Sequence, residues 1–185
     1  MSVTDAEISL AEFESLEKAA PDSLHVEFIG GRIHVTPAPD GDHSEASRTV
    51  ASQIISRRPD LWLYEKRGLA VPAHRAGRAR VDGAVAPVGY FRGQPSWADP
   101  TGVLMVVETT SGCEADARVD RVDKRDAYAQ AGLPVCLLVD RHRAGAVVHW
   151  SPAAGRYQHQ SRAAFGTTLR LPGPFDFDLD TAEFA

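Results

Sequence analysis

Hydrophobic and polar residues follow two different periods along the chain, which predicts a mixture of helices and strands. In residues 4–20, apolar side chains recur at spacings of three and four after two capping boxes, so we expect an amphipathic N-terminal helix. A second helix is expected to begin at Asp42 as its cap and to run to about Arg58, because Pro59 ends it. The capping boxes are Thr4/Glu7 and Ser9/Glu12, and the apolar positions are Leu10, Phe13, Leu16 and Ala20.

Other segments are rich in β-branched and aromatic residues and are separated by turn residues, as strands are. Residues 25–29 and 32–36 flank the pair Gly30-Gly31, which tolerates positive φ, and they predict a β-hairpin. Short strands are also expected at 61–65, 69–71 and 80–87, with a second hairpin at 144–150 and 157–160 and loop residues over 89–102.

Two apolar runs without alternation, at 103–107 and 135–139, predict strands that are covered on both faces. Between them, residues 116–131 read as a helix closed by Gly132 and Pro134. Strand, helix and strand in this order indicate a parallel crossover. Glu108 stands at the carboxyl end of the first of these central strands.

Length and composition favour an ordinary globular protein. The chain has 185 residues, which corresponds to one domain, and its 43% hydrophobic and 24% charged residues disfavour disorder, collagen and coiled coil. No apolar run approaches the roughly 20 residues that cross a bilayer, and the acidic N-terminus lacks the apolar region of a signal peptide. We therefore expect a cytoplasmic protein. Cys113 and Cys136 are too few for a disulfide scaffold or a thiolate zinc site.

The net charge of −5 argues against a protein that coats nucleic acid by neutralising phosphates. It does not exclude a nuclease, because carboxylates that bind a metal add negative charge of their own. The chain carries 20 basic residues, of which only Lys18, Lys66 and Lys124 are lysines. Because the chain uses arginine for most of its positive charge, the presence of a lysine at position 124 slightly favours a specific role for its compact ammonium group.

Asp82, Glu108 and Lys124 are the candidate chemical groups on or beside the predicted central sheet. Carboxylates on two adjacent strands can hold Mg²⁺, with Mn²⁺ as a substitute, and this cation favours phosphate chemistry. A nearby ammonium can orient the attacking water and offset charge on phosphorus. Each acid also has a purely structural alternative: Asp82 can be a turn residue beside a glycine, and Glu108 can end a strand and face solvent. For Lys124 the alternative is an exposed ion pair with Asp120, four residues earlier.

Several short motifs, in one order along the chain, resemble the Uma family of restriction-endonuclease-like proteins in the PD-(D/E)XK nuclease superfamily. The resemblance spans roughly residues 25–150. It rests on Glu27-Phe28-Ile29-Gly30-Gly31-Arg32-Ile33, Pro37-Ala38-Pro39 with His43, Val81-Asp82-Gly83-Ala84-Val85, Val106-Val107-Glu108-Thr109-Thr110-Ser111, Asp120 with Lys124 and Tyr128-Ala129-Gln130-Ala131-Gly132, and Leu137-Leu138-Val139-Asp140.

This resemblance implies an α/β (α+β) fold with a mixed central β-sheet flanked by helices, an N-terminal helix and a β-hairpin. We expect one restriction-endonuclease-like domain over residues 1–185, with an N-terminal helix in 1–22, a core in 23–150 and a C-terminal extension in 151–185. The activity implied is Mg²⁺-dependent cleavage of nucleic acid, with DNA as the expected substrate.

The resemblance also implies site residues. Asp82 and Glu108 match the metal-binding carboxylates, and Lys124 matches a lysine that has moved onto the following helix, because Thr110 stands in its usual place. Val81 replaces the proline of the motif, and residues 112–114 depart from the common Pro-Ser-Thr. Supporting positions that match the family pattern are Glu27, His43, Asp120 and Tyr128.

Three functions compete. The first is a metal-dependent endonuclease. Enzymes that cut duplexes often act as homodimers, so we expect a homodimer here. Apolar residues of the tail at 172–185 favour this dimer if they are exposed. The second is a catalytically inactive module of the same fold that binds protein or nucleic acid. The third is a small-molecule hydrolase with Ser111 or Cys113 as nucleophile, but neither residue lies in a Gly-x-Ser-x-Gly motif. Arginines that could flank a nuclease cleft are Arg75, Arg78, Arg80, Arg118, Arg121 and Arg125.

Overall fold

The computed structural model describes residues 8–37, 40–71, 77–110 and 119–184, and the side chains of Pro37, Val119 and Asp120 also lie outside the described part. Its main feature is a mixed sheet in the order β2-β1-β4-β6-β7-β8-β9, with β3 paired to β4 and β5 paired to β3. The strands are β1 (Leu24–Ile29), β2 (Arg32–Pro37), β3 (Leu61–Val71), β4 (Gly77–Pro87), β5 (Trp97–Ala98), β6 (Met105–Thr109), β7 (Val135–Asp140), β8 (Gly145–Ala153) and β9 (Arg156–Ala164).

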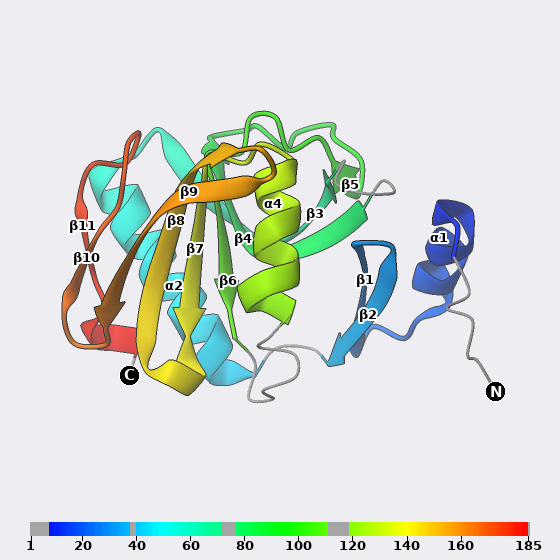
Figure 1. Ribbon diagram of the computed structural model, residues 1–185, viewed down its shortest axis with the longest axis horizontal. Coiled ribbons are helices and arrows are strands. Elements are labelled where there is room, and N and C mark those ends of the chain that lie inside the picture. Colours follow the sequence, from blue (N-terminus) through cyan, green and yellow to red (C-terminus); the bar gives the residue numbers. More distant parts are fainter. Residues whose placement is uncertain (1–7, 38–39, 72–76, 111–118, 185) are drawn as a thin grey trace.

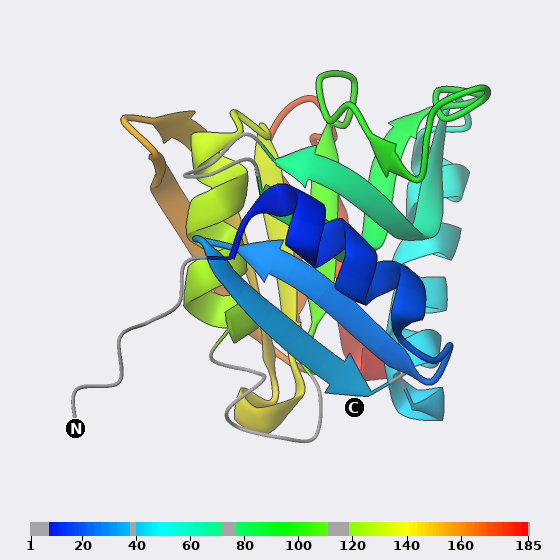
Figure 2. The same cartoon turned by 90° about the vertical axis from the view of Figure 1, so that its right-hand side faces the viewer.

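Helices cover both faces of this sheet, as Figure 2 shows, with α2 (Gly41–Arg57) on one face and α4 (Arg125–Gln130) on the other. The helix α1 (Leu10–Ala19) lies beyond the β1–β2 hairpin at one end of the molecule, and the small sheet β10 (Thr168–Arg170) and β11 (Asp178–Asp180) lies at the opposite end (Figure 1). This arrangement confirms the expected mixed sheet flanked by helices. Among the described residues, no helix is long and apolar enough to cross a bilayer.

The N-terminal helix begins as the sequence predicts. The hydroxyl of Ser9 accepts a hydrogen bond from the backbone N–H of Glu12, and the Glu12 carboxylate binds the backbone N–H of Ser9, which is a complete capping box. The alternative box Thr4/Glu7 lies outside the described residues. Phe13 is fully buried and stacks on Phe28 of β1, so the helix packs on the predicted hairpin.

Several predicted boundaries are wrong, since β4 begins at Gly77 rather than at 80, β5 lies within the expected loop 89–102, and β6 begins at Met105 rather than at 103. The helix α2 begins two residues earlier than expected, because Asp40 rather than Asp42 is its cap and accepts a hydrogen bond from the backbone N–H of His43 at 2.8 Å. The two short strands expected at 61–65 and 69–71 form one strand, β3, which pairs with β4 on both sides of Lys66. Lys66 has a φ of 52°, so a single left-handed residue interrupts the pattern without ending the strand.

The crossover between β6 and β7 is parallel, as predicted, and pairs Glu108 with Leu138. The strand β6 runs to Thr109, so Glu108 lies inside it rather than beyond its end. The helix expected at 116–131 is two segments, the π-helix η1 (Val119–Lys124) followed directly by α4. A π-helix widens the turn by one residue, and such turns are frequent at functional sites.

The C-terminal segment is packed into the protein. β9 extends the main sheet past residue 150, and Phe175, Phe177, Leu179 and Phe184 are at most 7% exposed in the core beneath α2. These apolar residues are therefore not available for a dimer interface, and this argument for a homodimer is wrong.

Candidate active site

Glu108 is held at the centre of the sheet. Its strand β6 lies between β4 and β7, and its side chain is 1% exposed. The three preceding positions of the strand are apolar and fully buried, so a hydrophobic run carries one carboxylate into the interior. A carboxylate in such a place requires hydrogen-bond donors, because burial without partners is costly.

Lys124 supplies the first of these donors. Its Nζ atom lies 2.8 Å from Oε2 of Glu108, 3.2 Å from Oε1 of Glu27 and 3.0 Å from the carbonyl oxygen of Arg80. The lysine is 4% exposed and is the last residue of η1. Its side chain therefore points into the protein, which decides between the two alternatives for this residue.

Tyr128 supplies the second donor. Its hydroxyl donates a short hydrogen bond to Oε1 of Glu108, from a position one helical turn after Lys124. The ring is fully buried, and burial together with the charges of Glu108 and Glu27 raises the pKa of Tyr128 well above its usual value. Tyr128 therefore stays protonated and donates its hydrogen throughout the physiological range. The hydroxyl thus holds Glu108 rather than Lys124, while the ring packs in the hydrophobic core.

Asp82 lies on β4, which pairs with β6. The last register pair before it is Gly83 with Val107, so Asp82 stands where the two strands begin to separate. Its Oδ2 accepts hydrogen bonds from the backbone N–H of Thr109 at 2.8 Å and from Nε2 of His43 at 2.9 Å. Burial raises the pKa of Asp82, but the hydrogen bond from His43 and the charge of Lys124 outweigh it, and the net shift is downward.

His43 reaches Asp82 from the first turn of α2. Because Asp40 caps this helix, the turn that carries His43 is fixed. Arg141 fixes it further, since its guanidinium binds Asp40 at 2.9 Å and Asp42 at 3.1 Å. Arg141 comes directly after β7, so one arginine connects the carboxyl end of the sheet with the start of α2. The sequence contains no local signal for this contact, because 101 and 99 positions separate the arginine from its two partners.

Glu27 completes the group from β1. Its Oε1 accepts a hydrogen bond from the backbone N–H of Arg80 at 2.7 Å as well as the contact with Lys124. Glu27 is 4% exposed, so it is a buried carboxylate and not a solvent-facing one. The remaining candidates lie elsewhere: the side chain of Asp120, together with Ser111, Cys113 and Arg118, lies outside the described residues, and so does Arg75.

The candidate active site thus consists of Glu27, His43, Asp82, Glu108, Lys124 and Tyr128. Within the described ranges, no three His, Cys, Asp or Glu side chains are arranged together around a vacant metal position. The two oxygens of Glu108 face Lys124 and Tyr128.

The flanking arginines do not surround the site as free charges. Arg80 forms an ion pair with Glu17 and lies over the ring of Trp97, and Arg78 lies 3.6 Å from Glu14, so both are directed towards α1. Arg125 is bonded to its neighbour Asp126. The expectation that these three arginines present free charge to a phosphate is therefore wrong.

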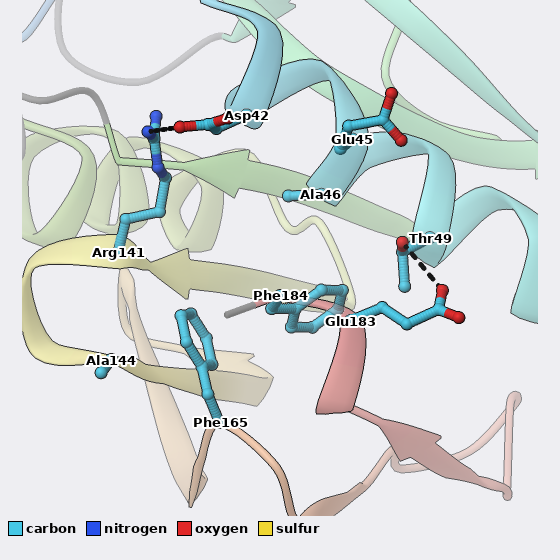
Figure 3. A pocket seen from close by; sticks show the side chains of 9 residues that line it. All are labelled: Asp42, Glu45, Ala46, Thr49, Arg141, Ala144, Phe165, Glu183 and Phe184. Carbon is cyan, nitrogen blue, oxygen red and sulfur yellow. Dashed lines mark hydrogen bonds and ion pairs between the residues drawn. The ribbon is translucent and has the colours of Figure 1, made fainter.

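A pocket of about 710 Å³ lies next to this site, between α2, the connection from β7 to β8, and the 3-10 helix η3 (Ala182–Phe184), as shown in Figure 3. Its walls combine the carboxylates of Asp42, Glu45 and Glu183 with the rings of Phe165 and Phe184. The side chains of the candidate active site do not line it.

Comparisons with known proteins agree with this fold. A family model described as "Uma2: Putative restriction endonuclease" matches residues 10–182. Among solved structures, the chain is similar to one described as a putative nuclease belonging to DUF820 from Anabaena variabilis ATCC 29413, with a TM-score of 0.68 and 16% identity over 96% of this chain and 97% of that chain. A comparison with curated proteins finds no match.

Proposed function

The chain belongs to the Uma2 family of putative restriction endonucleases. From this membership we propose that it is a metal-dependent endonuclease that hydrolyses phosphodiester bonds of nucleic acid, with DNA as the expected substrate. The observation that carries the proposal is the position of the Lys124 ammonium, 2.8 Å from Glu108 and close enough to Asp82 to lower the pKa of that carboxyl.

The residues present fit a divalent cation of the Mg²⁺ or Mn²⁺ type. Asp82 and Glu108 offer carboxylate oxygens, the ligands that these hard cations prefer. Lys124 and Tyr128 hold the two oxygens of Glu108 in a defined orientation. The described hydrogen bonds to Asp82 all involve Oδ2, which leaves Oδ1 for a ligand. Thr109, whose backbone N–H binds Asp82, has a buried hydroxyl without a hydrogen-bond partner within the described part of the chain.

Asp82 and Glu108 would hold the cation, and the cation would polarise a phosphoryl oxygen and lower the pKa of a bound water. The protein then performs the other tasks. Lys124 orients the attacking water and offsets the charge that develops on the phosphate oxygens. An ammonium has three donors, and Lys124 directs them to Glu108, Glu27 and the Arg80 carbonyl. The contact with Glu27 is the longest, so we infer that it is the one exchanged for substrate.

His43 and Tyr128 act as positioning residues in this proposal. His43 holds Oδ2 of Asp82, and Tyr128 holds Oε1 of Glu108, so each carboxylate is oriented by one neutral or cationic donor from a helix. Positioning of this kind matters because small displacements of reacting groups lower rates strongly.

The test is cleavage of single-stranded, duplex and branched DNA with Mg²⁺ or Mn²⁺. We expect activity in the wild type and its loss in Asp82→Asn and Lys124→Met. Equal activity in the wild type and in both variants would contradict the assignment of Asp82 and Lys124 to the active site.

A catalytically inactive binding module is the second candidate. It is favoured by the acidic net charge of −5 and by the internal ion pairs of Arg78, Arg80 and Arg125. Calorimetric titration with Mn²⁺ separates the two functions. Metal binding that is lost in Asp82→Asn or Glu108→Gln supports the enzyme, whereas no binding to the wild type supports the module.

A homodimer and a cytoplasmic location complete the proposal. Cleavage of both strands of a duplex often uses two active sites, which a two-fold symmetric dimer supplies. Sedimentation of the purified chain, alone and with duplex DNA, tests the dimer.

A further inference from the structure

A groove of about 320 Å³ lies on the α4 face of the sheet, and arginines from four different elements line it. We call it the arginine groove. Arg121 comes from η1, Arg125 from α4, Arg143 from the 3-10 helix η2 (Arg141–Arg143) and Arg162 from β9. Asp140 is the one carboxylate among the lining residues. Arg121 and Arg125 form ion pairs with Asp140 and Asp126, so Arg143 and Arg162 supply most of the positive charge of this groove on a protein of net charge −5.

The groove and the candidate active site share one row of residues across the sheet. Glu108 of β6 pairs with Leu138, Leu138 pairs with Val147 and Val147 pairs with Arg162. Residues directly opposite each other in neighbouring strands project to the same face. Glu108 and Arg162 therefore stand in one row on one face, three strand spacings or about 14 Å apart.

The helical wall of the groove is also shared with the site. Arg121 precedes Lys124 by three residues in η1, and its guanidinium forms a buried two-fold ion pair with Asp140, at 2.7 and 2.8 Å. This pair fixes η1 against the end of β7, the strand next to Glu108. The helix thus presents the ammonium to the active site and its arginines to the groove.

Two of the four arginines have guanidinium groups that are accessible to an anionic ligand. Arg143 is 58% exposed, and its guanidinium lies 3.8 Å from Asp140, which already holds Arg121. Arg162 is exposed, and no acidic group of the described residues forms an ion pair with it. Neighbouring Gln160 adds a neutral donor to the lining.

We propose that the arginine groove binds the phosphate backbone of the nucleic acid strand that enters the candidate active site. This rests on the proposed nuclease function and adds the path of the substrate. Guanidinium groups match phosphate oxygens in geometry, and phosphate contacts hold the strand without reading its sequence. The row of about 14 Å corresponds to roughly four nucleotides at about 3.4 Å each. An acidic protein segment has similar charge, but the shared row with Glu108 favours nucleic acid.

The test measures binding without cleavage, in EDTA, with fluorescein-labelled 20-nucleotide single strands and 20-base-pair duplexes. We expect the double variant Arg143→Ala/Arg162→Ala to weaken binding about tenfold and, on a duplex, to reduce the salt slope by about 0.9 for each phosphate that is no longer neutralised. The control is Arg156→Ala, an exposed arginine at the other end of β9, which is expected to bind as the wild type does.

The outcomes separate this inference from the proposed function. Weaker binding in the double variant but not in the control supports the groove, whether or not the wild type cleaves DNA with metal. Cleavage by the wild type together with unchanged binding in the double variant overturns the groove and leaves the nuclease. Polyglutamate is the comparison probe for an acidic protein segment. Binding of polyglutamate but not of DNA, or of neither probe, also overturns the inference.

Discussion

Lys124 and Glu108 meet at 2.8 Å between Nζ and Oε2, although one comes from a π-helix and the other from the central strand of the sheet. Both side chains are at most 4% exposed. A buried charge is stable only when it is paired and hydrogen-bonded, so the two groups depend on each other for folding as well as for any chemistry.

The first prediction concerns this pair. Lys124→Met leaves Glu108 and Glu27 buried with less compensation, and we expect a loss of about 3–5 kcal/mol in the free energy of unfolding. Adding Glu108→Gln removes one of the unpaired charges and is expected to restore part of the stability without restoring cleavage. Urea unfolding of the two single variants and the double variant measures the coupling. Additive losses would contradict the pairing.

A second prediction concerns Tyr128. Tyr128→Phe leaves Oε1 of Glu108 without its donor, and we expect a loss of about 1–3 kcal/mol in stability and a clear decrease in the rate of cleavage. Tyr157→Phe is a matched control, because its hydroxyl donates to the carbonyl of Leu133 at 2.9 Å and not to a carboxylate. We expect the control to lose stability but not activity. An equal decrease of cleavage in both variants would argue against a positioning role for Tyr128.

The third prediction uses pH. The pKa of Asp82 is lower in the folded protein than its usual value of 3.8, so its ionised form contributes stability that is fully present above pH 3.8. This contribution is lost as the pH falls through the lower, folded pKa. Asp82→Asn has no such group, and the difference in stability between wild type and variant should shrink over this acid window. A difference that stays constant in urea unfolding at decreasing pH would contradict the lowered pKa.

His149 gives the fourth prediction. Burial, together with the charges of Arg125 and Arg162, lowers its pKa from 6.5 to about 4. The unfolded chain therefore takes up a proton at a higher pH than the folded protein, and stability is lost as the pH falls from 6.5 towards 4. Arg162→Ala removes one of the two positive charges and should raise the pKa of His149 in an NMR titration. Arg156→Ala should leave that pKa where it is.

Local sequence signals predicted the elements that form the frame of the site. The hairpin around Gly30-Gly31, the capping box at Ser9 and the parallel crossover each depend on residues close together in the chain. Glu108 could be singled out because it directly follows the uniformly apolar run 103–107.

Contacts between distant residues could not be predicted in this way. Arg80 is bonded to Glu17 across 63 positions, so an arginine that seemed available for phosphates is partly neutralised. Arg141 is bonded to Asp40 across 101 positions. The π-helical turn that ends at Lys124 has no known local signal in this sequence, and the burial of the C-terminal aromatic residues depends on where α2 lies.

The most direct measurement is metal-dependent cleavage by the wild type, Asp82→Asn, Glu108→Gln and Lys124→Met under identical conditions. The account predicts cleavage by the wild type with Mg²⁺ or Mn²⁺ and none in EDTA, with decreases of about 10²- to 10³-fold in each variant that circular dichroism shows to be folded. Cleavage by all three folded variants at the rate of the wild type would contradict it.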